Sequence, residues 1–209
     1  AQGEGISFSD AGKIRFAHLL DEFGVDFIEG GFAGSNPRDR RFFEDVRKER
    51  LGHARVTAFG STRRVDKDAR DDEQLAGLLA TETEWVTIYG KSWLLHVHDV
   101  LRTTGDINVQ MIADTVGHLR AAGRQVFFDA EHFFDGYKDD PAYALRALGA
   151  AVKEGAAGVV LCDTNGGSLP HEVFAITQAV CAAFPGVQVG IHTHNDGGLA
   201  VANSLEAVR

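Results

Sequence analysis

Short apolar runs rich in β-branched and aromatic residues alternate along the chain with longer segments in which apolar residues recur every three or four positions. The short runs predict strands at residues 25–28, 54–59, 85–89, 125–128, 158–162 and 187–191. The longer segments predict helices at residues 10–23, 37–50, 71–81, 108–122, 141–154, 169–184 and 198–209. Strands and helices that alternate in this way indicate βα units and a parallel sheet.

Polar or glycine-rich residues follow nearly every predicted strand, as in the segments 29–31, 129–132 and 192–194. A doubly wound open sheet needs functional residues only beside its switch point, whereas a (β/α)8 barrel gathers all its strand ends around one mouth. The pattern therefore favours a (β/α)8 TIM barrel over a doubly wound sheet. Because such a barrel takes about 250 residues, we expect residues 1–209 to form one incomplete barrel domain, covering about units two to seven.

The composition indicates a globular protein and argues against two kinds of partner. Hydrophobic residues make up 44% of the chain, and 30 acidic against 21 basic residues give a net charge of −9. An acidic chain without a basic face is a poor nucleic-acid ligand, and no apolar run approaches the roughly 20 residues of a membrane span. We expect a cytoplasmic location. Cys162 and Cys181 are expected to be small buried thiols and not a disulfide.

Two histidines at the end of the last predicted strand form the leading candidate site. Residues i and i+2 of a strand face the same side, so His192 and His194 can offer both imidazoles to one metal ion. Each histidine could instead be structural, but acidic residues at neighbouring strand ends favour a metal site. Two imidazoles are an incomplete ligand set. A set of two histidines and one carboxylate suits Zn, Mn, Fe or Co, and Mg less readily.

Other strand ends carry further polar candidates. Asp129 and Glu131 are again i and i+2, and paired carboxylates can divide acid and base duties; the alternative is a solvated strand end. Thr164 could bind a substrate carboxylate or cap a turn. Glu29 precedes two glycines and could support a ligand or simply belong to a turn. Arg63 could bind an anion or be a surface charge.

Two of these segments resemble a known superfamily. His192-Thr193-His194-Asn195-Asp196 and Asp163-Thr164-Asn165-Gly166 resemble the metal-dependent acyltransferases and lyases on a TIM barrel, which include isopropylmalate synthase, homocitrate synthase and HMG-CoA lyase. The segments 3–9, 29–31, 34–37, 59–64, 90–93 and 129–137 resemble the citramalate synthase branch. This resemblance covers essentially the whole chain.

The resemblance implies an amino-acid biosynthetic acyltransferase that condenses acetyl-CoA with a 2-oxo acid, most simply pyruvate, giving citramalate after thioester hydrolysis. It implies a divalent ion, Mn, Mg or Zn, on His192 and His194, and acetyl-CoA as co-substrate. It also implies a proton-transfer role for Glu131, pocket positions for Gln2 and Thr164, and support from Glu29. Isopropylmalate or homocitrate synthase, an HMG-CoA-lyase-like carbon–carbon lyase, and a non-catalytic fragment are the alternatives.

The same resemblance implies sequence on either side of the chain. In that family an Arg-Asp-Gly ends the first strand, so we expect it directly before Ala1. We expect the eighth strand and a C-terminal accessory region after Arg209. The chain by itself is therefore expected to be inactive, and the full-length protein is expected to be a homodimer.

Overall fold

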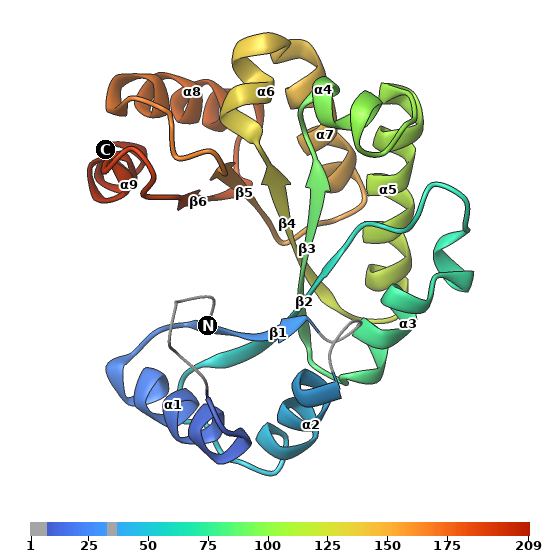
Figure 1. Ribbon diagram of the computed structural model, residues 1–209, viewed down its shortest axis with the longest axis vertical. Helices are drawn as coiled ribbons and strands as arrows, with labels where there is room; N and C mark the ends of the chain where they lie inside the picture. Colours follow the sequence, from blue (N-terminus) through green and yellow to red (C-terminus); the bar gives the residue numbers. More distant parts are fainter. Residues whose placement is uncertain (1–7, 33–36) are drawn as a thin grey trace.

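Six parallel strands form a single curved sheet in the computed structural model, which describes residues 8–32 and 37–209 without the side chains of residues 37–39 (Figure 1). The strands are β1 (Phe27–Phe32), β2 (Arg55–Ser61), β3 (Trp85–Lys91), β4 (Gln125–Glu131), β5 (Gly158–Asp163) and β6 (Gln188–Thr193). Their order in the sheet is β1-β2-β3-β4-β5-β6. A doubly wound sheet reverses its strand order at a switch point, and this sheet does not. The predicted TIM-barrel class is therefore confirmed, as an open half-barrel.

Helices line the outer, convex side of this sheet (Figure 1). They are α1 (Asp10–Phe23), α2 (Pro37–Val46), α3 (Glu73–Ala80), α4 (Leu94–Asp99), α5 (Gly105–Ala121), α6 (Phe133–Asp139), α7 (Pro141–Lys153), α8 (Pro170–Ala183) and α9 (Ala200–Val208), with a 3-10 turn at Ala69–Asp71. The seven predicted helices are present. The short helices α4 and α6 were not predicted, because six or seven residues are too few to show a helical period.

Local sequence explains where the helices begin and end. The Ser9 hydroxyl accepts a hydrogen bond from the Gly12 N–H at 3.0 Å and caps α1. Gly24 ends the same helix with a left-handed φ of 91°. Asp140 caps α7 through the Tyr143 N–H at 2.9 Å, ahead of Pro141 in the first turn. No helix among the described residues is long and apolar enough to cross a membrane.

The hydrophobic core lies between the helices and the outer face of the sheet. Phe42, Phe43, Phe133 and Phe134 are at most 3% exposed and belong to this core. They pack in one cluster with outward-facing strand residues such as Val86, Ile88, Val126, Phe128, Val159 and Leu161. Because alternate strand residues face opposite sides, the remaining positions of each strand face the inside of the curve.

The inner face is aromatic at one end of the strands and polar at the other. Phe27, Trp85 and Phe127 form a ring cluster near the amino ends, with centroids 4.8–4.9 Å apart. Toward the carboxyl ends the inner face carries Asp129 and, beyond it, Glu131. The strands extend one to four residues further in this direction than predicted. The aromatic cluster therefore closes one end and leaves the polar side chains at the mouth.

Candidate active site and metal centre

The two predicted metal ligands lie side by side at the end of β6. The rings of His192 and His194 have centroids 5.0 Å apart, inclined at 64°. Both side chains are exposed, because β6 lies at an edge of the described sheet. Partial desolvation of the ring by the surrounding protein lowers the pKa of His192, and the charge of His194 lowers it further. A lowered pKa favours the neutral imidazole, which is the form that binds a metal.

A third and a fourth donor approach His192 from neighbouring strands. Ligand atoms of His192, Cys162 on β5 and Asp129 on β4 all lie within 4.8 Å of one another. Imidazole, thiolate and carboxylate are all ligands of divalent transition metals. These three residues therefore fit a divalent ion, and Asp129 is a candidate for the carboxylate ligand beside His192. His194 is not part of this cluster.

Both cysteines were expected to be small buried thiols. Cys162 is buried, but Cys181 is exposed, so the prediction was wrong for Cys181. Cys162 and His192 are Cα partners in the pairing of β5 with β6. Burial and then the negative charges of the inner face, with Asp129 first, raise the pKa of the Cys162 thiol well above its ordinary value. Cys162 and His192 are each the second-last residue of their strand. This shared position is the sequence feature that could have predicted their contact.

Two carboxylates on the inner face are shifted toward their protonated forms. Burial, and then the charge of Glu29, raise the pKa of Asp129 to about 7. Glu29 on β1 is an exposed residue. The concave surface around its carboxylate still removes part of the water and so raises its pKa. Burial thus favours the neutral form of both carboxyl groups, and the charge of Glu29 adds to this effect at Asp129.

Glu131 forms an ion pair with Lys91 at the mouth of the curved sheet. Their side chains are 25% and 15% exposed respectively. The charge of Glu131 also adds to the effect of burial in raising the pKa of Tyr89, the neighbouring inner-face residue of β3. Lys91 and its pairing with Glu131 were not predicted, since the residues lie 40 positions apart in the chain.

Thr164 lies immediately after β5 and contacts the end of β4. Its hydroxyl oxygen accepts a hydrogen bond from the backbone N–H of His132 at 2.9 Å. His132 has a left-handed φ of 57°, which is rare for a residue other than glycine and turns the chain directly after Glu131. The Thr164 hydroxyl hydrogen makes no hydrogen bond within the described part of the chain, so the hydroxyl can still donate to a ligand.

Of the remaining predicted site residues, the structure describes Arg63, which does not join this cluster. The Arg63 guanidinium contacts Asp114 on α5 at 2.8–2.9 Å and the carbonyl oxygens of Arg64 and Lys67 at 3.0 and 2.9 Å. These contacts join the loop after β2 to α5, and they do not favour binding of an anion by Arg63. Gln2 lies outside the described residues.

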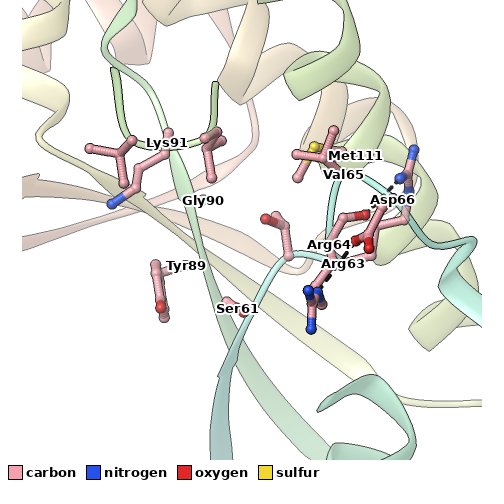
Figure 2. A pocket seen from close by; sticks show the side chains of 12 residues that line it. Ser61, Arg63, Arg64, Val65, Asp66, Tyr89, Gly90, Lys91 and Met111 are labelled. Carbon is pink, nitrogen blue, oxygen red and sulfur yellow. Dashed lines mark hydrogen bonds and ion pairs between the residues drawn. The ribbon is translucent and has the colours of Figure 1, made fainter. Parts of the chain in front are cut away.

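A cavity of about 470 Å³ lies beside Lys91, at the carboxyl ends of β2 and β3. Its lining combines polar side chains with an apolar part, and includes Ser61, Arg64, Val65, Tyr89, Val100 and Met111. Figure 2 shows Tyr89 and Lys91 projecting to one side, and Arg63, Arg64 and Asp66 gathered on the other. The cavity therefore connects the region of the Lys91–Glu131 pair with a rim on which Arg64 pairs with Asp66 at 3.3 Å.

Several known proteins are similar in sequence to this chain over most or all of its length. All of residues 1–209 match the family described as HMGL-like. The (R)-citramalate synthase of Aquifex aeolicus is 54% identical over all of this chain, and the (R)-citramalate synthase of Streptomyces coelicolor is 50% identical. The 2-isopropylmalate synthase of Aliivibrio fischeri is less similar, at 32% identity over 94% of the chain.

The fold resembles that of a solved lyase. The HMG-CoA lyase of Bacillus subtilis superposes with a TM-score of 0.79 and 18% identity, and covers 99% of this chain and 69% of the lyase chain. The chain spans 39% of the length of each of the two citramalate synthases and 37% of that of the isopropylmalate synthase.

Proposed function

The chain belongs to the HMGL-like family, and on that basis we propose that it forms most of the catalytic barrel of a longer enzyme that condenses acetyl-CoA with pyruvate to give citramalate. The observation that carries this proposal is the 50–54% identity to two citramalate synthases over the whole chain. We propose that the full-length protein also contains a first strand, an eighth strand and an accessory region. We further propose that it is cytoplasmic and forms a homodimer. The support for these proposals is the resemblance to the family.

The proposed reaction joins the methyl carbon of acetyl-CoA to the keto carbon of pyruvate. A base removes a methyl proton from the thioester, the resulting enolate attacks the ketone, and the former keto oxygen takes up a proton. Water then cleaves the thioester and releases coenzyme A with a free thiol. The residues of the chain must therefore bind a carboxylate, handle protons and exclude water from the enolate.

The first two of these tasks have candidates at the mouth. We assign binding of the pyruvate carboxylate to the Thr164 hydroxyl, because its hydrogen has no partner among the described residues and the His132 N–H holds its oxygen. We assign proton transfer to Glu131, which faces the mouth beside Thr164 and Lys91. Asp129 and Glu29 supply further carboxylates, and Arg63 is left out because its guanidinium is bonded to its own loop and to α5.

A divalent ion would be held by His192 and His194, with Asp129 as the candidate carboxylate. When bound, such an ion polarises a ketone and makes its carbon a better electrophile. The sequence and the donor set leave Mn, Mg and Zn open, although a nearby thiol favours Zn over Mg.

The cavity beside Lys91 offers room for the co-substrate. Its apolar part, which includes Val65, Val100 and Met111, suits the extended arm of a coenzyme A thioester. The cationic side chain of Arg64 at the rim suits its phosphates. We therefore propose that acetyl-CoA enters from this side and presents its acetyl group toward Glu131.

Isopropylmalate synthase chemistry is the second candidate, because that enzyme differs only in the size of the 2-oxo acid. The lower identity, 32% against 54%, disfavours it. One or two methylenes are worth only about 1–3 kcal/mol in a pocket, so the substrate must be measured.

A free-thiol release assay on the full-length protein tests the proposal. Acetyl-CoA is supplied with pyruvate, 2-oxobutyrate, 2-oxoisovalerate or 2-oxoglutarate, before and after metal removal by a chelator. We expect release of coenzyme A to be fastest with pyruvate, to stop on chelation and to return with a divalent ion. Release with 2-oxoisovalerate but not with pyruvate would replace the proposal by the isopropylmalate reaction.

A further inference from the structure

The Lys91–Glu131 pair joins two adjacent strands at the point where both end. Lys91 is the last residue of β3 and Glu131 the last of β4, and their Cα atoms are partners in the parallel pairing. Both side chains therefore extend from one face of the sheet at the same level. The Lys91 ammonium contacts the Glu131 Oε2 atom.

Buried hydrogen bonds fix the backbone on each side of the pair. The Asn108 side-chain amide donates to the Lys91 carbonyl oxygen at 2.8 Å. The Ser92 hydroxyl and backbone N–H both donate to the Glu131 carbonyl oxygen, at 2.7 and 3.3 Å. Asn108 and Ser92 are both 0% exposed. The two Cα atoms are thus held, and only the side-chain torsions of Lys91 and Glu131 stay free.

Lys91 is also the counterion of an acidic surface. Within the six described strands the lysines and arginines are Lys91 and Arg55, and Arg55 lies at the opposite end of β2. The inner face near Lys91 carries Asp129 and Glu131, with Glu29 on β1. Without the ammonium, the Glu131 carboxylate would be repelled by these groups and attracted to bulk water.

Surface pairs of the same residue types are weaker. Lys67 and Glu73 form a pair in which the side chains are 30% and 87% exposed, against 15% and 25% for Lys91 and Glu131. Exposed pairs contribute little because water screens them, whereas a more enclosed charge depends on its partner. Lys67 therefore provides a matched control.

We propose that Lys91 is a positioning residue that holds the Glu131 carboxylate over the mouth, where it meets the reacting substrate. This inference rests on the proposed function, in which Glu131 transfers protons. Lys91 acts through Glu131 and forms no bond with the substrate in this role.

A double-mutant cycle in the full-length protein measures this role. We expect Lys91→Met to lower kcat about 100-fold, the lower range for loss of a general acid or base, with KM for acetyl-CoA changed less than about threefold. Glu131→Gln should cost at least as much, and the double variant should be no slower than Glu131→Gln alone, because residues that act as one unit are not additive. Lys67→Met should leave kcat unchanged. Losses that multiply in the double variant, or an unchanged kcat in Lys91→Met, would overturn the proposal.

Crystal structures of the same variants supply a measurement that needs no turnover. In Lys91→Met the Glu131 carboxylate should move toward solvent, and in Lys67→Met it should stay. If the Glu131 carboxylate does not move in Lys91→Met, the positioning role is overturned, whether or not the unmodified protein is active. If the unmodified protein is inactive, only the proposed reaction is overturned. If Lys91→Met does not fold, Lys91→Arg replaces it. Arginine keeps the charge but changes the donor geometry, so we expect an intermediate kcat and a displaced Glu131; wild-type values for both would overturn the proposal.

Discussion

The side chains at the mouth include an imidazole suited to binding a metal, a carboxyl group that can exchange a proton and a hydroxyl donor, all near the carboxyl ends of neighbouring strands. His192 is held toward its neutral form, Asp129 titrates near pH 7, and Thr164 keeps a hydroxyl hydrogen free to donate. Each property results from burial or from one neighbouring group. The site is therefore sensitive to single substitutions that leave the fold unchanged.

Thr164→Val tests binding of the substrate carboxylate. A hydrogen bond to a charged group is worth about 1.5–3 kcal/mol, so KM for pyruvate should rise roughly 10- to 150-fold. Thr164→Ser keeps the hydroxyl and should retain most of the affinity. Thr177→Val on α8 is the control, because the buried Thr177 hydroxyl has no hydrogen-bond partner among the residues that the structure describes. Steady-state kinetics check these values, and an equal KM in Thr164→Val and the unmodified protein would exclude this role.

Helices and strands are joined by contacts that leave little space between them. Gly30 in β1 lies directly under α2, where an added Cβ would meet ring carbons of Phe43 and Phe42 at 2.6 and 2.7 Å. Asp21 in α1 accepts hydrogen bonds from the N–H groups of Gly52, His53 and Ala54 at 2.6–2.8 Å, which ties the helix to the segment before β2. The glycine after Glu29 thus serves helix packing.

Gly30→Ala should destabilise the protein by about 1–3 kcal/mol, as for other overpacked core positions. Gly167→Ala is the control, because a Cβ at Gly167 meets no atom of the described part of the chain within 4 Å. Urea unfolding of the full-length protein measures both free energies. A similar small change in the two variants would show that the phenylalanine rings adjust without cost.

Asp21→Asn should make the stability less dependent on acid. The backbone N–H groups of Ala54, Gly52 and His53 lower the pKa of Asp21 below its ordinary value in the folded protein. The ionised group therefore stabilises the fold above the unfolded-state pKa of about 3.9, and this contribution is lost as the pH falls through the lower folded-state pKa.

Urea midpoints at pH 7 and at pH 3 test this expectation. The difference between the unmodified protein and Asp21→Asn should be largest at pH 7 and smaller at pH 3. Glu22→Gln, at the next and exposed position of α1, should show no such pattern. An Asp21→Asn effect that is equal at both pH values would argue against the linkage.

The whole molecule places two different spaces next to each other at the carboxyl ends of the strands. The concave inner face holds the carboxylates and histidines, and the cavity of about 470 Å³ lies beside Lys91, between the ends of β2 and β3 and the helices α4 and α5. A small 2-oxo acid suits the first space, and a long thioester suits the second. Only a curved sheet of several strands brings the two together.

Val100→Trp tests this division by filling the cavity. Val100 is 59% exposed, so a larger side chain can be accepted there without overpacking the core. KM for acetyl-CoA should rise roughly tenfold, equal to about 1.4 kcal/mol, while KM for pyruvate stays the same. Val201→Trp on α9, where Val201 is 75% exposed, is the control. A rise in KM for pyruvate alone would place the 2-oxo acid in the cavity instead.

The sequence by itself determined the strands, the longer helices and the barrel class, because hydrophobic periodicity and polar strand ends are local properties. It also placed His192 with His194 and Asp129 with Glu131, since residues two apart in a strand share a face. Only the tertiary structure decided that Cys162 approaches His192, that Lys91 pairs with Glu131, and that Arg63 is bonded to Asp114. These contacts join residues 30 to 51 positions apart, and they depend on strand register and sheet curvature, which no local pattern of residues specifies.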